Sequence, residues 1–384
     1  MTTTALSRIV PFYIYAVVFS SLSIVIGLIW DISWHTSIGR DGLFSPPHLL
    51  IYLGAVTAGL FSGYHVLRLT FSGREAERDV SIRFWGIFYG SLGALFCIWG
   101  AFTMITSAPF DDWWHNTFGL DVQILSPPHT VLLLGMVTVQ FGAMVSVLAY
   151  QNRLATSSYA VIKTLKWSFT LSSGFMLVMI YTIASQYLGR HAMHSSFFYI
   201  VSGLLFPLPL VAVSVASPGR WAATQTAIVY MIVMASLVWI LPLFAAEPRL
   251  GPVLNHITHY QSFDFPLLLI FPAIAIDWLN ERMQHKKAFF KALFLGPLLV
   301  IVMLAIQWSM GSFLMSPYAR NWAFGTTSWY FGSDPNWEYR YAFAPWNEEP
   351  LPVFIKGIFV AFLIASASAW LGLIWGKWMK SVKR

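Results

Sequence analysis

An Asp and a His four residues apart, followed 13 or 14 residues later by a second His, occur twice in this sequence. The first set is Asp31, His35 and His48, and the second set is Asp111, His115 and His129. An Asp and a His at this spacing share one face of a helix, about one turn apart, so a single helix offers two ligands to one ion. The second His follows Ser-Pro-Pro, which is typical of a helix start with Ser at the N-cap and Pro in the first turn. The sequence therefore predicts two sites, each made of two His and one carboxylate.

The two sets belong to a longer internal repeat. DISWHTSIGRDGLFSPPH at 31–48 returns as DDWWHNTFGLDVQILSPPH at 111–129. Asp41 aligns with Asp121 and Ser45 aligns with Ser126, so the second copy has one extra residue between these two positions. Self-similarity at a fixed offset indicates a repeated structural unit. We expect two helical hairpins in the same orientation, each with an Asp and a His at the end of one helix and a His at the start of the next.

A purely structural role would also account for one copy, because Asp31 could pair with Arg40 and the histidines could hydrogen-bond across the turn. Two copies that keep the same three residue types at spacings that differ by only one residue favour metal binding instead. Two neutral imidazoles and one carboxylate suit copper, zinc or non-haem iron, and the spacing does not choose among them. The neighbouring aspartates are expected to accept the second imidazole N–H, and the neighbouring tryptophans to close the site to water. These accessory residues are Trp34, Asp41, Trp114 and Asp121.

The composition is that of a polytopic membrane protein. Of 384 residues, 57% are hydrophobic and only 10% are charged, which lies far outside a soluble globular profile. The lone Cys97 excludes a disulfide framework and a Cys-rich metal site. We expect an all-α membrane helix bundle of about ten transmembrane helices with parallel helical-hairpin repeats. The apolar runs lie near 11–30, 47–69, 84–106, 128–149, 167–187, 197–217, 222–245, 263–280, 292–312 and 353–375.

The basic residues indicate the orientation in the membrane. With the N-terminus placed in the cytoplasm, 17 of the 23 Lys and Arg residues fall on cytoplasmic segments. Cytoplasmic loops of membrane proteins carry such an excess. We therefore expect both termini in the cytoplasm and both motifs toward the extracytoplasmic side. The net charge of +7 follows from this distribution and does not indicate nucleic-acid binding.

Two further histidine pairs fall on the same expected side of the membrane, namely His191 with His194, and His256 with His259. A His-x-x-His pair in a loop is a weak metal signal by itself. Its expected place on the same side of the membrane as the repeat makes each pair a candidate accessory to the metal sites, a metal entry path or a proton route. The sequence leaves these alternatives open.

Three segments are expected along the chain. Residues 1–150 form a two-hairpin metal-binding repeat domain, and residues 151–291 form a second membrane helical half. Residues 292–384 contain two C-terminal helices joined by an aromatic extracytoplasmic loop at 313–352. Aromatic residues at this depth usually form an interfacial belt, which is favoured over a substrate lid or a subunit contact.

The motif resembles the C subunit of the copper-containing membrane monooxygenases, the particulate methane and ammonia monooxygenase family. The residues that carry the resemblance are Asp31, Trp34, His35, Arg40, Asp41, Pro46 and His48, which stand in the pattern D-x-x-W-H, R-D and a Pro-containing turn to the second His. A neighbouring site of the family uses Asn and two His at a slightly longer spacing, which Asp111, His115 and His129 match with Asp in place of Asn. The resemblance is specific over 31–48 and 111–129, and the C-terminal half has no counterpart in it.

The resemblance implies a subunit of a copper-dependent membrane monooxygenase that oxidises a small apolar, alkane-like substrate or ammonia with O2. It also implies copper as cofactor, with iron or zinc as alternatives, and sister membrane subunits as partners. The electron donor is not encoded in this chain. The alternative function is a membrane copper transporter or copper-delivery factor, which would place ligands at several depths rather than at one side.

Overall fold

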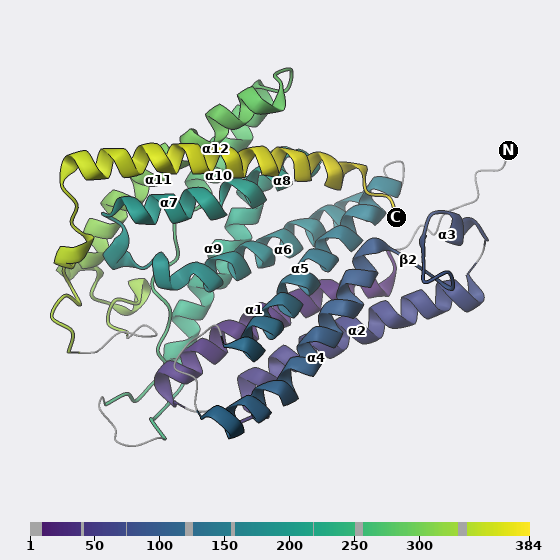
Figure 1. Ribbon diagram of the computed structural model, residues 1–384, viewed down its shortest axis with the longest axis horizontal. Coiled ribbons are helices and arrows are strands. Elements are labelled where there is room, and N and C mark those ends of the chain that lie inside the picture. The colour runs from purple at the N-terminus through teal and green to yellow at the C-terminus, as the bar shows by residue number, and fades with distance from the viewer. Residues whose placement is uncertain are drawn as a thin grey trace. The chain divides into compact units, whose positions relative to one another are not determined.

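The computed structural model describes residues 10–39, 42–73, 75–119, 126–154, 158–217, 219–249, 256–328 and 336–384. Its course is drawn in Figure 1. Long helices dominate the described chain, and its sheet is a single hairpin of two short strands. The predicted all-α polytopic membrane bundle is confirmed.

The first part of the chain contains two long helical hairpins separated by a short excursion. The elements are α1 (Phe12–Ser37), α2 (Pro46–Ser72), α3 (Glu75–Asp79), β1 (Ile82–Phe84), β2 (Phe88–Gly90), α4 (Leu92–Phe118), α5 (Pro127–Arg153) and α6 (Tyr159–Ala184). The predicted third apolar run begins later than its sequence suggested, because β1 and β2 pair as an antiparallel hairpin before α4 starts. The turn between these strands places Trp85 and Gly86 at positive φ.

The second part alternates long helices with short 3-10 turns. The elements are η1 (Ser185–Tyr187), η2 (Arg190–Ala192), α7 (Ser196–Leu205), α8 (Pro207–Ala216), α9 (Ala222–Ile240), η3 (Leu241–Leu243), α10 (Ile270–Arg282), α11 (Ala288–Met315), η4 (Pro317–Ala319), η5 (Trp322–Phe324), η6 (Pro345–Asn347) and α12 (Leu351–Ser381). Across the described residues, nine helices are long and apolar enough to cross a membrane, with α7 and α8 forming one such span.

The predicted eighth transmembrane helix, at 263–280, is wrong as a continuous helix. The helix there, α10, has 13 residues and is therefore about 20 Å long, against roughly 30 Å of hydrocarbon. Residues 260–268 have no helical structure and are mostly buried. Pro266 and Pro272 explain the break, because proline disfavours helical backbone before it and lacks the N–H that a helix interior needs.

The broken segment nevertheless runs along the whole of α9. At one end, Ala245 pairs with His259 in an antiparallel bridge. At the other end, the Asp277 carboxylate of α10 accepts the backbone N–H of Thr224 at 2.9 Å, at the start of α9. The extended residues and the short helix α10 together therefore span the same length as one full helix. Non-helical backbone is tolerated at membrane depth only where protein surrounds it and satisfies its polar groups.

Side chains of neighbouring helices accept hydrogen bonds from the N–H groups of that backbone. The Leu267 N–H donates to the Tyr230 hydroxyl at 3.1 Å, and the Leu268 N–H donates to Gln307 Oε1 at 2.9 Å. The Arg190 guanidinium forms a buried ion pair with the Asp264 carboxylate at 3.1 Å, and the Arg190 backbone N–H donates to the same carboxylate. Buried charges persist in a low-dielectric interior when they are paired and hydrogen-bonded in this way. The extended segment is therefore fixed by specific polar partners.

The described chain groups into two compact units. Unit 1 takes the described residues of Met1–Leu28, Asp41–Met176 and Lys380–Arg384, and unit 2 takes those of Ile29–Arg40 and Leu177–Met379. Helix α1 thus contributes its first part to unit 1 and its last turns, with Asp31 and His35, to unit 2. The predicted division at residues 150 and 291 follows the sequence rather than these contacts and stays a prediction.

Within unit 1, both hairpins close on a glycine that allows the two backbones to approach. A Cβ on Gly54 of α2 would lie 2.6 Å from the Ile24 side chain and 3.0 Å from the Ser20 carbonyl oxygen of α1. A Cβ on Gly135 of α5 would lie 2.6 Å from the Met104 side chain and 2.9 Å from the Gly100 carbonyl oxygen of α4. Small residues at helix contacts permit this approach in membranes.

The two contacts occupy equivalent positions in the two copies of the repeat. Gly54 and Gly135 follow the Ser-Pro-Pro-His of their own copy at the same distance. Ile24 and Met104 likewise precede Asp31 and Asp111 at the same distance. The alignment of the two motifs therefore extends into the helices that carry them.

Substituting Gly135 with Ala is expected to destabilise unit 1 by about 1–3 kcal/mol, because the added methyl group collides with backbone that cannot move independently. The same substitution at Gly54 is expected to act in the same direction. Gly63 of α2 is the matched control, since a Cβ there meets nothing within 4 Å. Thermal unfolding in detergent measures the difference. Equal melting temperatures for the Gly135→Ala and Gly63→Ala variants would contradict the close-contact argument.

Candidate metal centre

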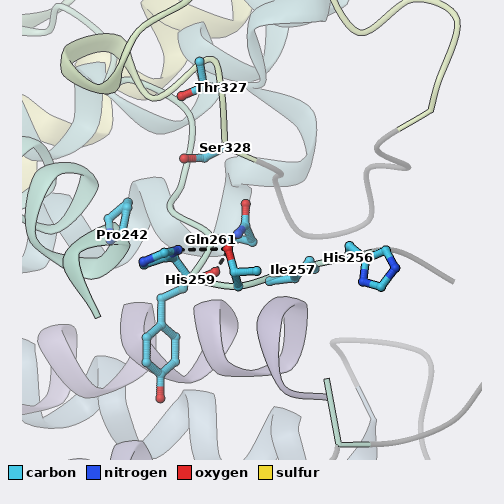
Figure 2. A pocket seen from close by; sticks show the side chains of 9 residues that line it. Pro242, His256, Ile257, His259, Gln261, Thr327 and Ser328 are labelled. Carbon is cyan, nitrogen blue, oxygen red and sulfur yellow. Dashed lines mark hydrogen bonds between the residues drawn. The ribbon is translucent and has the colours of Figure 1, made fainter. Parts of the chain in front are cut away.

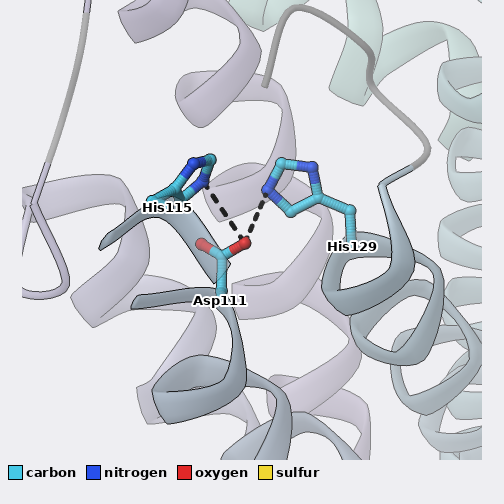
Figure 3. Close-up of side chains that lie close together, drawn as sticks. All are labelled: Asp111, His115 and His129. Carbon is cyan, nitrogen blue, oxygen red and sulfur yellow. Dashed lines mark ion pairs between the residues drawn. The ribbon is translucent and has the colours of Figure 1, made fainter. Parts of the chain in front are cut away.

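The second predicted ligand set comes together in unit 1. His115 Nε2 lies 3.4 Å and His129 Nε2 lies 3.3 Å from the same Asp111 oxygen, Oδ1. Within the described residues, these three form the one group of His, Cys, Asp or Glu whose ligand atoms all lie within 4.8 Å of one another. Figure 3 shows the carboxylate of Asp111 between the two imidazoles. Two ligand atoms that are each about 2.1 Å from one ion at a tetrahedral angle are about 3.4 Å apart, so both observed distances suit a shared metal.

Two helix ends position these side chains. Asp111 and His115 lie four residues apart near the C-terminus of α4. His129 lies in the first turn of α5, where the Ser126 hydroxyl accepts the His129 backbone N–H and Pro127 begins the helix. The predicted Ser-Pro-Pro-His helix start is confirmed for α5. The negative end of the α4 dipole favours a cation beside Asp111 and His115.

The backbone sets the tautomer of His115. Its Nδ1 lies 3.2 Å from the Gly119 carbonyl oxygen, which can only accept a hydrogen bond, so Nδ1 carries the proton. In neutral His115 the Nε2 lone pair then faces the Asp111 carboxylate. A lone pair opposite a carboxylate is unfavourable unless a metal cation or a proton lies between them, and an imidazole held by a backbone carbonyl is a common arrangement of metal-binding histidines.

Glycine is required where the α4 helix ends. Gly119 has φ 87° and ψ −171°, a region that residues with a Cβ almost never occupy. Gly39, its counterpart in the first copy, has φ 96°. The glycine shared by the two motifs is therefore explained by backbone geometry. Sequence reasoning missed the role of the Gly119 carbonyl, although its position four residues after His115 was a usable signal.

The first predicted set is divided between the two units. Asp31 and His35 belong to unit 2, and His35 Nε2 lies 3.9 Å from Asp31 Oδ2. His48 belongs to unit 1, where its Nδ1 lies 3.2 Å from the Gly42 carbonyl oxygen. The i, i+4 pair therefore forms as predicted from the helix, while the complete first site stays a prediction.

Of the four Asp and Trp residues predicted to support the metal sites, the structure describes the two tryptophans. Asp41 and Asp121 lie outside the described residues. Trp114 packs on Phe118 with ring centroids 4.5 Å apart, and Trp34 packs on Tyr260 at 6.2 Å. Both tryptophans thus add aromatic surface on the helix turns that carry the ligands, and their predicted role of excluding water stays a prediction.

His191 and His194 hold a distant segment of unit 2. The His191 Nδ1–H donates to the Ala342 carbonyl at 3.1 Å. The His194 ring is sandwiched between Trp308 and Phe343, with both centroid distances 3.9 Å. Burial lowers the pKa of His191; Asp264 opposes this shift, and Arg190 adds to it. These contacts give both histidines an anchoring role toward the aromatic segment near residue 342.

His256 and His259 line a polar pocket of unit 2 (Figure 2). His259 Nδ1 lies 3.0 Å from the Thr258 hydroxyl. In Figure 2 the His256 ring lies apart from that of His259, on the other side of Ile257. The His-x-x-His spacing at this place therefore does not gather two ligands about one ion.

No protein-family model, curated protein or solved structure matches this sequence. The chemistry of the site is therefore argued from the donor atoms of Asp111, His115 and His129 and from the two helix ends that hold them.

Replacing Gly119 with Ala is expected to weaken metal binding about 10–100-fold, the usual effect of losing a group that orients a metal-binding histidine. The substitution forces φ away from 87° and moves the carbonyl that holds His115 Nδ1. Gly86→Ala is the matched control, because Gly86 also has positive φ with no atom near its missing Cβ. Competition with a chelator of known affinity measures the change. Equal metal affinity in the two variants would contradict the role assigned to the Gly119 carbonyl.

Proposed function

We propose that this multi-pass membrane protein is a subunit of a copper-dependent membrane monooxygenase that oxidises a small apolar, alkane-like substrate or ammonia with O2. The observation that carries the proposal is the convergence of His115 Nε2 and His129 Nε2 on one oxygen of Asp111. A polar cluster at the end of two membrane helices is costly unless it binds something.

The donor set fits a redox metal. Two imidazoles and one carboxylate suit copper, zinc or iron, and the proposed choice of copper follows the motif shared with the copper monooxygenases. Copper bound there would supply the electron-transfer chemistry that O2 activation requires. Asp111 contributes the negative charge, and the tautomer imposed by Gly119 gives His115 a lone pair for the metal. The side chains of the three ligands are only 20–31% exposed, which limits competition from water.

The proposal includes a second, non-equivalent site at Asp31, His35 and His48. Its support is the matched pair of hairpins in unit 1, in which Gly54 and Gly135 make equivalent contacts at equivalent positions of the repeat. The two motifs would then be copies of one metal-binding hairpin. The extra residue before Ser126 and the additional Asp112 beside Asp111 make the copies unequal in reach and charge.

The partial exposure of the Asp111 cluster supports a second candidate function, that of a membrane copper transporter or copper-delivery factor. His129 is 31% exposed, so its metal could pass to a partner. Such a protein would bind copper reversibly and release it to an acceptor, with no oxygen-dependent turnover. Sister membrane subunits and a separate electron donor are required only by the monooxygenase.

Removing one ligand from each set is expected to separate the two sites. His115→Ala should remove part of the bound copper, and His35→Ala with His115→Ala should remove all of it and abolish oxygen-dependent turnover. Metal analysis of the protein purified in mild detergent with its associated membrane chains measures both effects. His285→Ala is the control, because His285 is exposed and outside both motifs. Wild-type copper content in the double variant would show that these histidines only pack polar turns, and copper binding without turnover would favour delivery.

The proposed orientation places both termini in the cytoplasm and the Asp111 cluster toward the opposite side. Thr117 of α4 and Ser381 of α12 are exposed, so each can be replaced by Cys after the native Cys97 is changed to Ser. From outside the cell, a membrane-impermeant thiol reagent is expected to label Thr117→Cys and to leave Ser381→Cys unlabelled. The opposite labelling pattern would reverse the proposed orientation.

A further inference from the structure

A polar cavity of about 270 Å³ lies within unit 2. Its lining consists of Pro242, residues 256–261, Thr327 and Ser328. Figure 2 shows Thr327 and Ser328 on one side, with His259 and Gln261 opposite them. Apart from Pro242 of η3, these walls come from two non-helical segments that are far apart in the sequence.

Hydrogen bonds fix one wall of this cavity. The Ala246 N–H donates to the Thr258 carbonyl at 3.0 Å, and the Tyr260 N–H donates to the Phe244 carbonyl at 3.1 Å. Gln261 is 8% exposed, and its Nε2 donates to the His259 carbonyl at 2.6 Å. The wall is therefore held in place before any ligand binds.

The opposite wall is also held. The Arg340 guanidinium donates to the Thr327 carbonyl at 2.7 Å. Thr326, next to Thr327, is fully buried and donates its hydroxyl to the Ala319 carbonyl. The hydroxyls of Thr327 and Ser328 thus belong to an ordered turn with a guanidinium behind it.

The lining chemistry favours a ligand rich in hydrogen-bond acceptors. Hydroxyl groups, imidazoles and an amide can all donate hydrogen bonds, and the described lining residues include no carboxylate. Arg340 adds positive charge beside the Thr327 turn. A metal ion is disfavoured in this cavity, because His256 and His259 lie apart. Among the described residues, the group of side chains that could hold a metal ion is the one at Asp111.

We propose that this cavity binds a small oxyanion of the carboxylate or phosphate type. Hydrogen bonds to a charged acceptor are about twice as strong as those between neutral groups, so the Thr327 and Ser328 hydroxyls suit such a ligand. The volume of the cavity is sufficient for an anion of this size. The proposal is independent of the copper site and of the monooxygenase function.

The bound anion would also stabilise the end of α1. The Gln261 N–H donates to the Ser37 hydroxyl at 2.8 Å, and the Ser33 hydroxyl donates to the Gln261 carbonyl. Ser33 and Ser37 alternate with Asp31 and His35 on the same helix turns. An occupant that holds Gln261 and its neighbours therefore reduces the mobility of the helix end that presents Asp31 and His35.

The test is calorimetric titration of the full chain, in a phosphate-free and carboxylate-free detergent buffer, with inorganic phosphate and separately with acetate. We expect saturable binding of at least one of the two, which also identifies the ligand type. The double variant Thr327→Val with Ser328→Ala should bind at least about 100-fold more weakly, as expected from losing two donors to a charged acceptor. Thr106→Val, at an exposed threonine of α4 in unit 1, should bind like the wild type.

Folding is checked by comparing the melting temperatures of these variants, and Thr327→Ser, which keeps the hydroxyl, should retain binding. The proposal is overturned if neither anion binds saturably, or if the double variant keeps its fold and its full affinity. Copper binding that persists in the His35→Ala with His115→Ala variant and is lost when His256 and His259 are also replaced with Ala would overturn it too, because the cavity would then be a metal site.

Discussion

The close approach of two helix backbones at a glycine is the constraint on which the hairpins of unit 1 depend. At Gly135 a Cβ would lie 3.0 Å or less from backbone atoms of Gly100 and Met104, so any larger residue changes the distance or the register between α4 and α5. Because α4 and α5 both continue as helices from this contact to the ligands, their register decides whether the start of α5 comes level with the end of α4. The meeting of His129 with Asp111 is thus determined about two turns away from the ligands.

The ends of α4 and α5 supply the groups that orient the ligands. The C-terminus of one helix has carbonyl groups without intrahelical partners, and the N-terminus of another has free N–H groups. In unit 1, the Gly119 carbonyl holds His115 and the Ser126 hydroxyl satisfies the N–H of His129. The same groups that complete the helices therefore orient two ligands. Because the same groups serve both purposes, only a few residue types need to be kept in the two motifs.

The sequence alone predicted the structure correctly where a single local rule determines it. Helical spacing predicted the Asp111 and His115 pair, and Ser-Pro-Pro predicted the start of α5. Hydropathy identified the nine helices of the described residues that are long and apolar enough to span a membrane. It misread 263–280, where apolar content hid the helix-breaking effect of Pro266 and the buried charge of Asp264. The anchoring contacts of His191 and His194 depend on residues far along the chain, Trp308 and Ala342 among them. Such contacts have no local signature, so the sequence offered only a candidate accessory, metal-entry or proton-route role there.

The two copies also illustrate how one motif acquires different surroundings. The last turns of α1 are bound by extended chain of unit 2, through Ser33 and Ser37 to Gln261 and through the Arg249 N–H to the Ile38 carbonyl at 2.9 Å. The corresponding turns of α4 expose Trp113 and Phe118, at 54% and 63%. The same Asp-x-x-x-His spacing therefore occurs on two helix ends that are restrained to different degrees. Because metal affinity depends on how well the ligands are held before binding, the difference in restraint is a physical reason for the two proposed sites to bind metal unequally.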